Sequence, residues 1–376
     1  MKIIIDKETL VTALELITPI TDKSSSKPIL SNFLLTAVPG EGGAAGRVTL
    51  SATDYEISIE GSFPAQVSEP GTVCISAKKT YDVCREFISG EIGIKTDAQM
   101  WVTLEGGASR LRLPSVDIGL YPQMERSALP NRFRINGKAL RRGFELTLMA
   151  TQANETRKNL SGVCSRVANG EMKLIATDGH RLAQVLRPVE VLAGTEHPEI
   201  IIPRKSLLEM EKVLDRAAGD VEISHDARAL VLTTDSVVVM TRLVEGKFPN
   251  VESVIPRDSD KTVLVNRERM ITALRMVSTM SVDKIKPVKI TLNEGLLRLE
   301  TERAEYGDVG DEFPVDYTGG EFQTGFNAKY LLDVLTVADH GERIELNFKA
   351  ALSPCLVKVP EDSNFLAVVM PLRLEW

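Results

Sequence analysis

Apolar residues recur at helical spacing near the start of three long segments of the chain. In each segment they fall three and four positions apart, so they share one face of a helix. The polar residues between them form the other faces, as in a helix that packs on a core. The apolar sets are Leu10, Val11, Leu14 and Ile17; Leu140, Phe144 and Leu148; and Met270, Ile271, Leu274 and Val277.

Alternating strands and a second helix follow each of these first helices. The second helices are predicted at residues 78–89, 205–217 and 329–338, and a glycine and a short alternating run follow each one. Alternation of apolar and polar residues is typical of a half-buried strand. In the first segment such runs predict strands at 2–5, 48–52, 57–59, 92–95, 100–104 and 110–113, and similar runs occur in the other two segments.

Three related sequence segments indicate that the chain uses one domain three times. LSATDYEI begins at Leu50, LIATDGHRL at Leu174 and LETERAEY at Leu299, which are 124 and 125 residues apart. Such a period is too long for a solenoid unit of about 20–50 residues and fits a domain of about 100–150. We predict an α+β protein with domains at 1–126, 127–254 and 255–376, each with two helices packed on one side of antiparallel sheets.

Composition and cysteine usage favour a cytoplasmic globular protein. The chain has 376 residues, of which 43% are hydrophobic and 26% charged. Its first residues, MKIIIDKE, are too short an apolar run for a signal peptide or a membrane span, so no membrane partner is expected. The cysteines are scattered without a CxxC pair, which favours a reducing compartment and a role as small core residues. They are Cys74, Cys84, Cys164 and Cys355.

The charge pattern combines an acidic total with cations on the predicted helices. A net charge of −7 argues against a tight static complex with nucleic acid, so any basic surface must be local. Each helix alone could simply be a solvated face. Because the cations recur at equivalent helices, we expect a common basic surface, with the acids elsewhere, that suits sequence-independent phosphate contacts. These cations are Lys78, Lys79, Arg85, Lys138, Arg141, Arg142, Arg204, Lys205, Lys212, Arg267, Arg269, Arg275 and Lys329.

The sharpest candidate for catalysis is Asp178 with His180. A metal-independent hydrolase or transferase that uses this pair is the alternative hypothesis, although no nucleophile or metal site accompanies it. A turn whose side chains bind local backbone groups is favoured. No histidine pair has metal-binding spacing and no phosphate-binding loop is present, so neither a metal nor a cofactor is expected. At the equivalent positions the other copies have Asp54 with Glu56 and Glu302 with Ala304.

Two short segments indicate local structure that bears on binding. Asp178-Gly179 between alternating runs predicts a hairpin with a type I′ turn, which needs two residues that tolerate positive φ. Near the end of the chain, residues 368–374 predict a terminal strand that Pro371 interrupts. An apolar groove for a partner peptide is the alternative interpretation of that segment.

Five motifs together resemble one bacterial protein family. They are ATDGHRLA at 176–183, IPRK at 202–205, FPN at 248–250, GFNAKYLLDVL at 325–335 and VMPLR at 369–373. In this order and over the whole chain they resemble the bacterial sliding clamps, the β subunits of DNA polymerase III. The resemblance implies a DNA-clamp fold and a non-enzymatic processivity factor for DNA replication.

In that family, three-domain chains pair head to tail as a homodimer and close into a ring with helices around the hole. The ring encircles double-stranded DNA without sequence preference. The DNA polymerase III alpha subunit, clamp-loader subunits and other proteins dock short peptides in a groove between the second and third domains. The resemblance places that groove at Leu160, Thr177, Gly179, His180, Arg181, Leu182, Pro249, Val254, Val368, Met370, Pro371, Leu372, Arg373 and Leu374.

The same resemblance assigns residues that face DNA and residues that close the ring. The interface is expected to bring Leu111 and Leu113 of the first domain against Thr279 and Met280 of the third. This chain departs from the family at Ser253, where an arginine is usual near the groove. It also continues past the usual end with Glu375-Trp376. The DNA-facing residues are expected to be Arg204 and Lys205, with Lys78, Lys79, Arg85, Asn154, Arg157 and Lys158.

Overall fold

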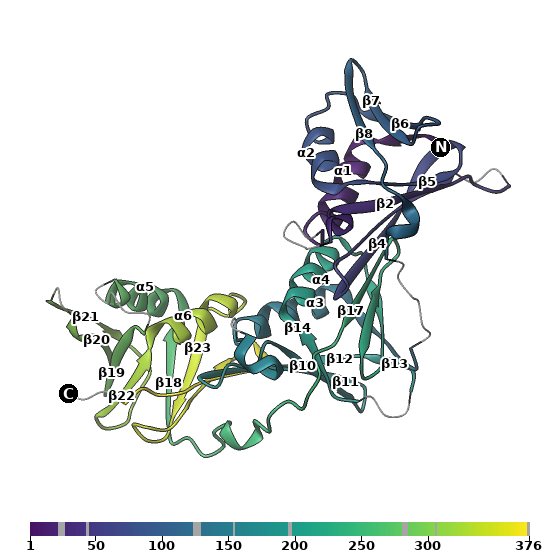
Figure 1. Cartoon of the computed structure of the whole chain (residues 1–376). Coiled ribbons are helices and arrows are strands. Elements are labelled where there is room, and N and C mark those ends of the chain that lie inside the picture. Colours follow the sequence, from purple (N-terminus) through teal and green to yellow (C-terminus); the bar gives the residue numbers. More distant parts are fainter. Residues whose placement is uncertain are drawn as a thin grey trace. The chain divides into compact units, whose positions relative to one another are not determined.

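A computed structural model describes residues 1–21, 27–42, 45–122, 129–152, 155–194, 198–279, 285–304 and 307–373. These residues form six α-helices and antiparallel β-sheets, which confirms the α+β class. The chain divides into two compact units (Figure 1). Unit 1 contains residues 1–138, 189–197 and 205–243, and unit 2 contains residues 139–188, 198–204 and 244–376.

Unit 1 is built on one antiparallel sheet. Its strands follow the order β13-β9-β15-β16-β17-β4-β1-β6-β7-β8, and β3 attaches β2 and β5 to β4. The strands are β1 Lys2–Asp6, β2 Asn32–Val38, β3 Gly46–Thr53, β4 Ile57–Glu69, β5 Gly71–Ser76, β6 Glu91–Thr96, β7 Trp101–Gly106, β8 Ser109–Pro114, β9 Asn131–Asn136, β13 Glu190–Ala193, β15 Asp220–His225, β16 Ala229–Thr233 and β17 Val237–Arg242. The helices are α1 Lys7–Ile17, α2 Ala77–Cys84 and α4 Arg204–Arg216, whose first residue belongs to unit 2.

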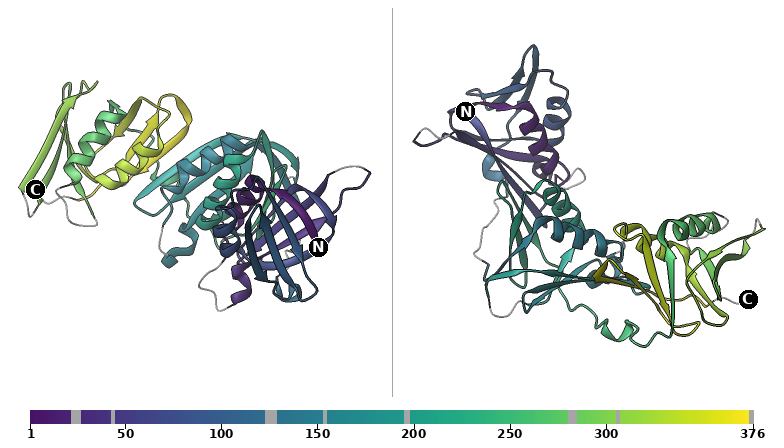
Figure 2. Two further views of the ribbon diagram at one scale, coloured as in Figure 1. Left: turned by 90° about the horizontal axis from the view of Figure 1, so that it is seen from above. Right: turned by 180° about the vertical axis from the view of Figure 1, so that it is seen from behind.

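Unit 2 has two antiparallel sheets, and helices α5 and α6 lie side by side against them (Figure 2). The sheet orders are β14-β10-β11-β12-β25-β24-β23-β18 and β21-β20-β19-β22. The strands are β10 Gly162–Ala168, β11 Glu171–Thr177, β12 Arg181–Pro188, β14 Ile200–Pro203, β18 Lys261–Asn266, β19 Pro287–Asn293, β20 Leu296–Ala304, β21 Gly307–Pro314, β22 Phe322–Asn327, β23 Arg343–Phe348, β24 Cys355–Val359 and β25 Asp362–Val369. The helices are α3 Gly137–Leu148, which begins in unit 1, α5 Arg267–Ser278 and α6 Ala328–Val337.

Local side-chain chemistry starts the helices where the sequence predicts them. Asp6 accepts a hydrogen bond from the Thr9 N–H at 2.7 Å, and Asn266 accepts one from the Arg269 N–H at 2.9 Å. Such caps satisfy N–H groups that have no partner within the helix. The predicted apolar faces lie in the core, with Leu10, Leu14, Leu140, Leu274 and Val277 fully buried.

Helix α2 is shorter than the sequence pattern predicts. It ends at Cys84 instead of continuing to Ser89. Beyond it, the N–H groups of Glu86 and Phe87 bond to carbonyls three residues back, which tightens the chain into single turns. Phe87 is thereby buried, while Ile88 is 97% exposed.

The cysteines are core residues, as predicted. All four are free and buried. Burial disfavours the thiolate and raises the pKa of Cys74, Cys84 and Cys164 to about 12. Within the described residues, no helix is long and apolar enough to cross a membrane.

Neighbouring repeats are joined by the same strand pairing in both units. In unit 1, β4 of the first repeat pairs with β17 of the second, with Ser58 opposite Met240. In unit 2, β12 of the second repeat pairs with β25 of the third, with Leu182 opposite Val368. Just past each pair, one further backbone N–H···O bond of 2.8 Å continues the join, from Arg242 to Glu56 and from Met370 to His180.

Among the described residues, two strands that correspond to the joining strands pair on one side only. Strand β21 of the third repeat corresponds to β4 and β12, and it ends the four-stranded sheet. Strand β8 of the first repeat corresponds to β17 and β25, and it ends the sheet of unit 1. An unpaired strand edge is a template for pairing with another chain.

Two adjacent leucines of α4 test the packing of this fold. Leu207 is fully buried and Leu208 is 38% exposed. We predict that Leu207→Ala lowers the free energy of unfolding by about 2–5 kcal/mol, because it leaves a cavity in the core. Leu208→Ala, the matched control, should lower it by less than about 1 kcal/mol. Urea denaturation measures both, and equal losses would contradict the assigned helix face.

Candidate functional site

The turn between β11 and β12 is held by side chains that bind its own backbone. Asp178 Oδ1 accepts hydrogen bonds from the N–H groups of His180 and Arg181 at 2.9 and 3.0 Å. Thr177 Oγ1 accepts one from the Gly179 N–H at 3.1 Å and donates one to the Arg181 carbonyl at 2.7 Å. Gly179 has a φ of 91°, whereas Asp178 has no positive φ. The hairpin prediction is confirmed, but the type I′ turn is wrong, because an Asx-type cap closes a longer loop.

The first repeat closes its corresponding turn in the same way. Asp54 Oδ1 accepts hydrogen bonds from the N–H groups of Glu56 and Ile57 at 2.9 and 2.8 Å. Thr53 Oγ1 accepts one from the Tyr55 N–H at 3.1 Å. The Thr-Asp pair that marks the repeat in the sequence is therefore a device of local folding.

Arg181 connects this turn to helix α6. Its Nε donates to Asp178 Oδ2 at 3.1 Å, and its Nη1 donates to Asp333 of α6. The guanidinium also lies 4.9 Å from the centre of the Tyr330 ring. Arg181 is only 8% exposed, and a buried cation is stable where such partners neutralise it. The His180 ring stacks on the same Tyr330, with ring centres 5.9 Å apart.

This geometry does not support the hydrolase alternative. Both oxygens of Asp178 are already engaged, one by backbone N–H groups and one by Arg181. The His180 ring lies against Tyr330, and among the hydrogen bonds of the described residues none joins its ring nitrogens to Asp178. Across the same described ranges, no three His, Cys, Asp or Glu side chains gather in a way that could hold a metal ion. The polar turn is a scaffold for its surroundings.

A hollow of about 330 Å³ lies beside the turn, and we call it the groove. Its floor is apolar, since buried Leu160, Leu182 and Val368 line it and belong to one core cluster. The β12–β25 pairing brings Leu182 and Val368 together although one belongs to the second repeat and the other to the third. The lining residues are Arg157, Asn159, Leu160, Thr177, Gly179, Arg181, Leu182, Pro249, Asn250, Val251, Val254, Val368 and Met370.

The structure brings most of the expected groove residues together. Those that line the groove are Leu160, Thr177, Gly179, Arg181, Leu182, Pro249, Val254, Val368 and Met370.

The remaining expected groove residues do not line it. His180 is exposed and its ring is held on Tyr330. Strand β25 ends at Val369, so the interruption predicted at Pro371 is confirmed. The Leu372 N–H then bonds to the Gly325 carbonyl at 2.8 Å, which attaches the chain to β22. Pro371, Leu372 and Arg373 are outside the lining for this reason, and Leu374 is outside the described residues.

Four lining residues were not assigned to the groove from the sequence. Asn159 and Asn250 are directly adjacent in sequence to expected groove residues and Val251 is two residues from Pro249, and this closeness is the signal that could have identified them. Arg157 was expected to face DNA. A Cβ added to Gly179 would lie 3.8 Å from Arg157 Nη1, an ordinary contact distance, so this guanidinium lies beside the turn at the rim.

The groove combines an apolar floor with a polar rim. Arg157 is exposed and makes no ion pair with any described residue, while the Asn159 side chain donates to the Lys247 carbonyl at 3.2 Å. Apolar pockets with a few polar groups at the edge suit a short peptide with apolar side chains.

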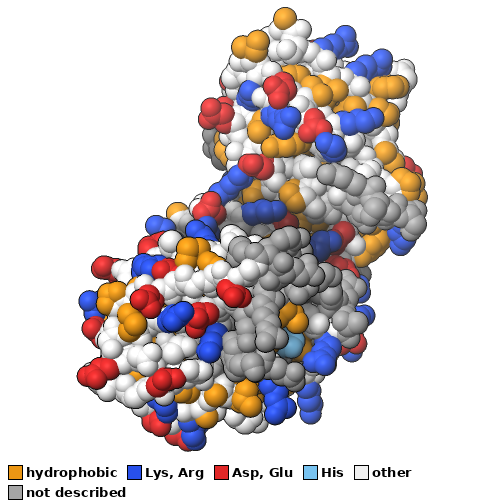
Figure 3. Space-filling model, turned by 90° about the vertical axis from the view of Figure 1, so that its left-hand side faces the viewer, with side chains coloured by type: hydrophobic (Ala, Val, Ile, Leu, Met, Phe, Trp, Pro, Cys, Tyr) orange, Lys and Arg blue, Asp and Glu red, His pale blue; other side chains and the backbone are white. Residues whose placement is uncertain are grey.

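The helix cations are interspersed with acids, contrary to the expected separation. Lys78 pairs with Asp82 at 2.7 Å, and Arg141 pairs with Glu145 at 3.0 Å, both one helical turn apart. Figure 3 likewise shows basic and acidic side chains mixed over the face that it draws. Pairs at this spacing stabilise a helix, so the cations serve their own helices as well as any partner.

The expected DNA-facing residues differ in how far they are already engaged. Arg204 donates to the Leu148 carbonyl and Thr151 Oγ1, both at 2.6 Å, and Lys205 donates to Asp54. Arg85 pairs with Glu86 at 3.1 Å. Lys79 and Lys158 are exposed, and Asn154 lies outside the described residues.

Of the expected ring-closing residues, Leu111 and Leu113 lie on the edge strand β8. Leu111 is half-buried and Leu113 is 8% exposed, both on β8. Thr279 is exposed directly after α5, and Met280 is outside the described residues.

Comparison with known proteins gives one consistent result over the whole chain. Models of the DNA polymerase III beta subunit match at residues 1–125 (N-terminal domain), 134–250 (central domain) and 252–373 (C-terminal domain). The beta sliding clamp of Pseudomonas aeruginosa is 31% identical, and all of both chains is covered.

Solved structures agree with the sequence comparison. The P. aeruginosa sliding clamp bound to griselimycin superposes with a TM-score of 0.93 at 30% identity. The griselimycin-bound clamp of Bartonella birtlesii has a TM-score of 0.92 at 29% identity. In both comparisons all of each chain is covered.

Substitutions in the turn separate scaffolding from catalysis. We predict that Asp178→Ala lowers the free energy of unfolding by about 3 kcal/mol, because the buried Arg181 side chain and two N–H groups of the turn lose their acceptor. His180→Ala, which removes the exposed ring, should cost less than about 1 kcal/mol. Urea denaturation of the two variants measures this, and a negligible loss for Asp178→Ala would contradict the scaffold role.

Proposed function

The chain belongs to the DNA polymerase III beta subunit family, and on this premise we propose that it is a sliding clamp: a homodimeric ring that encircles duplex DNA and is not itself catalytic. It tethers the DNA polymerase III alpha subunit, clamp-loader subunits and other peptide-bearing proteins to the template. The observation that supports ring formation best is the strand join that occurs twice within the chain. Among the described residues, β21 and β8 each have a partner on one side only.

A third join of the same kind requires a second copy of the chain. Strand β21 of one copy pairs with β8 of the other, and the reciprocal pairing closes the ring. Contact between two different surfaces produces a ring when the rotation between copies closes. Two chains of three repeats then supply six joins, four within chains and two between them.

The internal joins also predict the register between the two chains. Thr53 pairs with Ser58, Thr177 with Leu182 and Thr301 with Val309, so Val309 corresponds to Ser58 and Leu182. Leu113 precedes Tyr121-Pro122 by the same interval that separates Met240 from Phe248-Pro249. Because Met240 lies opposite Ser58, we place Leu113 opposite Val309 of the second copy.

The two free edges have complementary charges. Strand β8 carries Arg110 and Arg112, and β21 carries Asp308, Asp311 and Glu312. In the register above, Arg110 lies opposite Glu312 of the second copy. Opposite charges across an antiparallel pair stabilise it, whereas like charges would oppose self-pairing of either edge.

The first helices show a matching apolar position that is covered in two repeats only. Leu16 of α1 and Leu146 of α3 are 5% and 0% exposed. The corresponding Met276 of α5 is 39% exposed. A second apolar side chain, Ile88 after helix α2 of the first repeat, is 97% exposed. We propose that the helices at the third join cover these two side chains, together with the predicted Thr279 and Met280.

Retention on DNA then depends on enclosure and needs only weak ionic contact. Arg204 and Lys205 already have intramolecular partners, and the net charge is −7. Lys79 and Lys158 are exposed and offer loose phosphate contacts. Tight phosphate binding would impede sliding, so an acidic ring with a few weakly engaged cations suits the function.

The groove is the proposed docking site for partner peptides and for griselimycin. Its apolar floor accepts side chains of an extended segment, and Arg157, Asn159 and Asn250 supply polar contacts at the rim.

We propose that the repeats have their boundaries at 1–126, 127–254 and 255–376. We also propose a cytoplasmic location, because four buried free thiols suit a reducing compartment.

Release from circular and linear DNA tests enclosure. We predict that the protein, loaded onto a nicked circle by its clamp loader, stays bound at high salt and leaves when the circle is cut. High salt weakens phosphate contacts but gives a protein ring no free end of a circular DNA from which to slide off. Gel filtration of labelled protein with DNA measures retention. Equal salt-driven loss from circles and linear DNA would contradict the proposal.

A further inference from the structure

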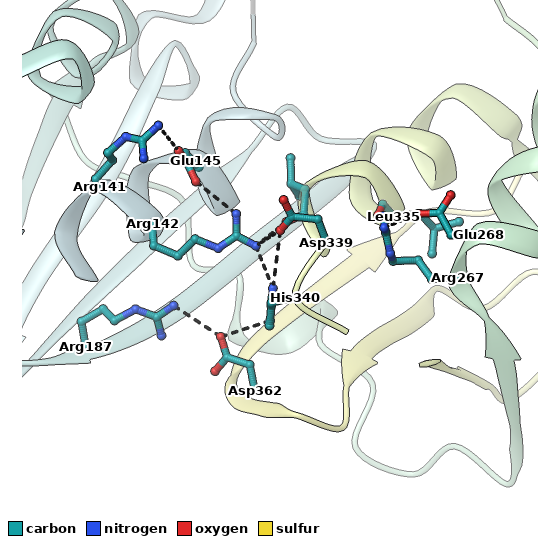
Figure 4. Close-up of polar contacts among 11 residues, drawn as sticks. Arg141, Arg142, Glu145, Arg187, Arg267, Glu268, Leu335, Asp339, His340 and Asp362 are labelled. Atoms are coloured by element: carbon teal, nitrogen blue, oxygen red, sulfur yellow. Dashed lines mark hydrogen bonds and ion pairs between the residues drawn. The ribbon is translucent and has the colours of Figure 1, made fainter. Parts of the chain in front are cut away.

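A second polar cluster joins the second and third repeats away from the groove lining (Figure 4). Arg142 of α3 donates through Nη2 to the Val337 carbonyl at 2.6 Å and to Asp339 Oδ1 at 2.7 Å. The same nitrogen lies 2.7 Å from His340 Nδ1. We call Arg142, Arg187, Asp339, His340 and Asp362 the Arg142 cluster.

The cluster secures the C-terminal end of helix α6. That end has no basic residue of its own in its last turn. Two arginines from neighbouring helices take its carbonyls instead: Arg267 of α5 donates to Leu335 at 2.9 Å, and Arg142 of α3 donates to Val337. Cations at a helix C-terminus are favoured by the unpaired carbonyls and by the helix dipole. Arg142 therefore attaches α6 of the third repeat to α3 of the second.

The hydrogen bonds define the state of His340 in this arrangement. Nη2 of Arg142 has two hydrogens for three close acceptors, so one hydrogen is shared between acceptors. Because a guanidinium can only donate, its contact with His340 requires Nδ1 to be the unprotonated nitrogen. The Nε2–H then faces Asp362 Oδ2 at 3.5 Å, and Asp362 also receives Arg187 at 3.3 Å. A proton on Nδ1 would set one donor against another and displace Arg142.

The charged groups around His340 come from several elements of the second and third repeats. Arg142 belongs to α3, Arg187 to β12 and Asp362 to β25, while Asp339 precedes His340 in the chain. Burial and then the Arg142 charge lower the pKa of His340 below its ordinary value, against the opposing effect of Asp362 and Asp339. The unfolded chain thus takes up this proton first, so the contribution of His340 to stability decreases as the pH falls below about 6.5.

Helix α6 connects the cluster to the groove. Its C-terminal end is held by Arg142, and one turn earlier Asp333 binds Arg181, which lines the groove. Tyr330 of the same helix supports both Arg181 and His180. Strands β12 and β25 make a second connection, since Leu182 and Val368 lie at one end of their pairing and Arg187 and Asp362 at the other.

We propose that the Arg142 cluster positions helix α6 for ligand binding in the groove, and that protonation of His340 releases this support and weakens binding. This inference rests on the proposed function of the groove. It makes Arg142 and His340 positioning residues that act through α6 and Arg181 without touching the ligand.

The test compares griselimycin affinity between pH 8 and pH 5.5 in the full-length protein. For the wild type we expect binding to weaken by about fivefold on acidification, a size typical of coupling through a packed network. In His340→Asn the side-chain oxygen can still accept from Arg142 but cannot be protonated, so this loss should disappear. Arg142→Met should weaken binding by a similar factor already at pH 8.

Arg134→Met is the matched control. Arg134 makes an ion pair with Glu190 at 3.1 Å in unit 1, whereas the Arg142 cluster belongs to unit 2. It should leave both the affinity and its pH profile unchanged. His180 is present in all these variants, so a difference between wild type and His340→Asn belongs to His340. Identical pH profiles for these two proteins would overturn the inference.

Thermal unfolding over the same pH range distinguishes failure of this inference from failure of the groove assignment. The wild type should lose more stability on acidification than His340→Asn, whether or not griselimycin binds. Absence of griselimycin binding at every pH, with this difference intact, would reject the groove assignment and with it the coupling. Equal pH dependence of unfolding in both proteins would reject the titration of His340 itself.

Discussion

Unsatisfied strand edges are the constraint on which the rest of the structure depends. Each repeat ends one of its sheets with a strand whose backbone groups need a partner. Within the chain, β4 pairs with β17 and β12 pairs with β25, and the β12–β25 pairing also brings together Leu182 and Val368 of the groove floor. Among the described residues, β21 of the third repeat pairs only with β20, so its other edge stays open. The incompleteness of one chain and its function as a ring have the same physical cause.

The helices and the threefold repeat could be predicted because their signals are local. Periodicity at Leu10, Leu14 and Ile17 needs only neighbouring residues to be informative, and the Thr-Asp turns repeat because they bind their own backbone. The strand joins could not be predicted in this way. Leu182 and Val368 are far apart in sequence, and no sequence pattern in either strand identifies the other as its partner. The early end of α2 was missed because Phe87 remains at helical spacing although the chain has left the helix.

The candidate site was partly predictable for related reasons. Residues inside the recognised motifs, such as Thr177 and Pro249, line the groove, whereas Asn159 and Val251 line it but lie outside those motifs. The sequence alone does not indicate which groups the charged side chains bind. Several of the cations expected to form a basic surface pair with acids on their own helices, and Arg142 reaches another repeat. Those pairings turn a surplus of helix cations into structural contacts.

A disulfide across the proposed edge pairing tests the central claim most directly. Opposed Cα atoms in an antiparallel pair lie about 4.5–5.5 Å apart, within the range that a disulfide spans. The native cysteines are buried with raised pKa and should not compete. On oxidation, the Leu113→Cys, Val309→Cys double variant should give a covalent dimer by non-reducing electrophoresis and mass photometry. Monomers alone, or a ladder of longer oligomers, would contradict closure by two copies.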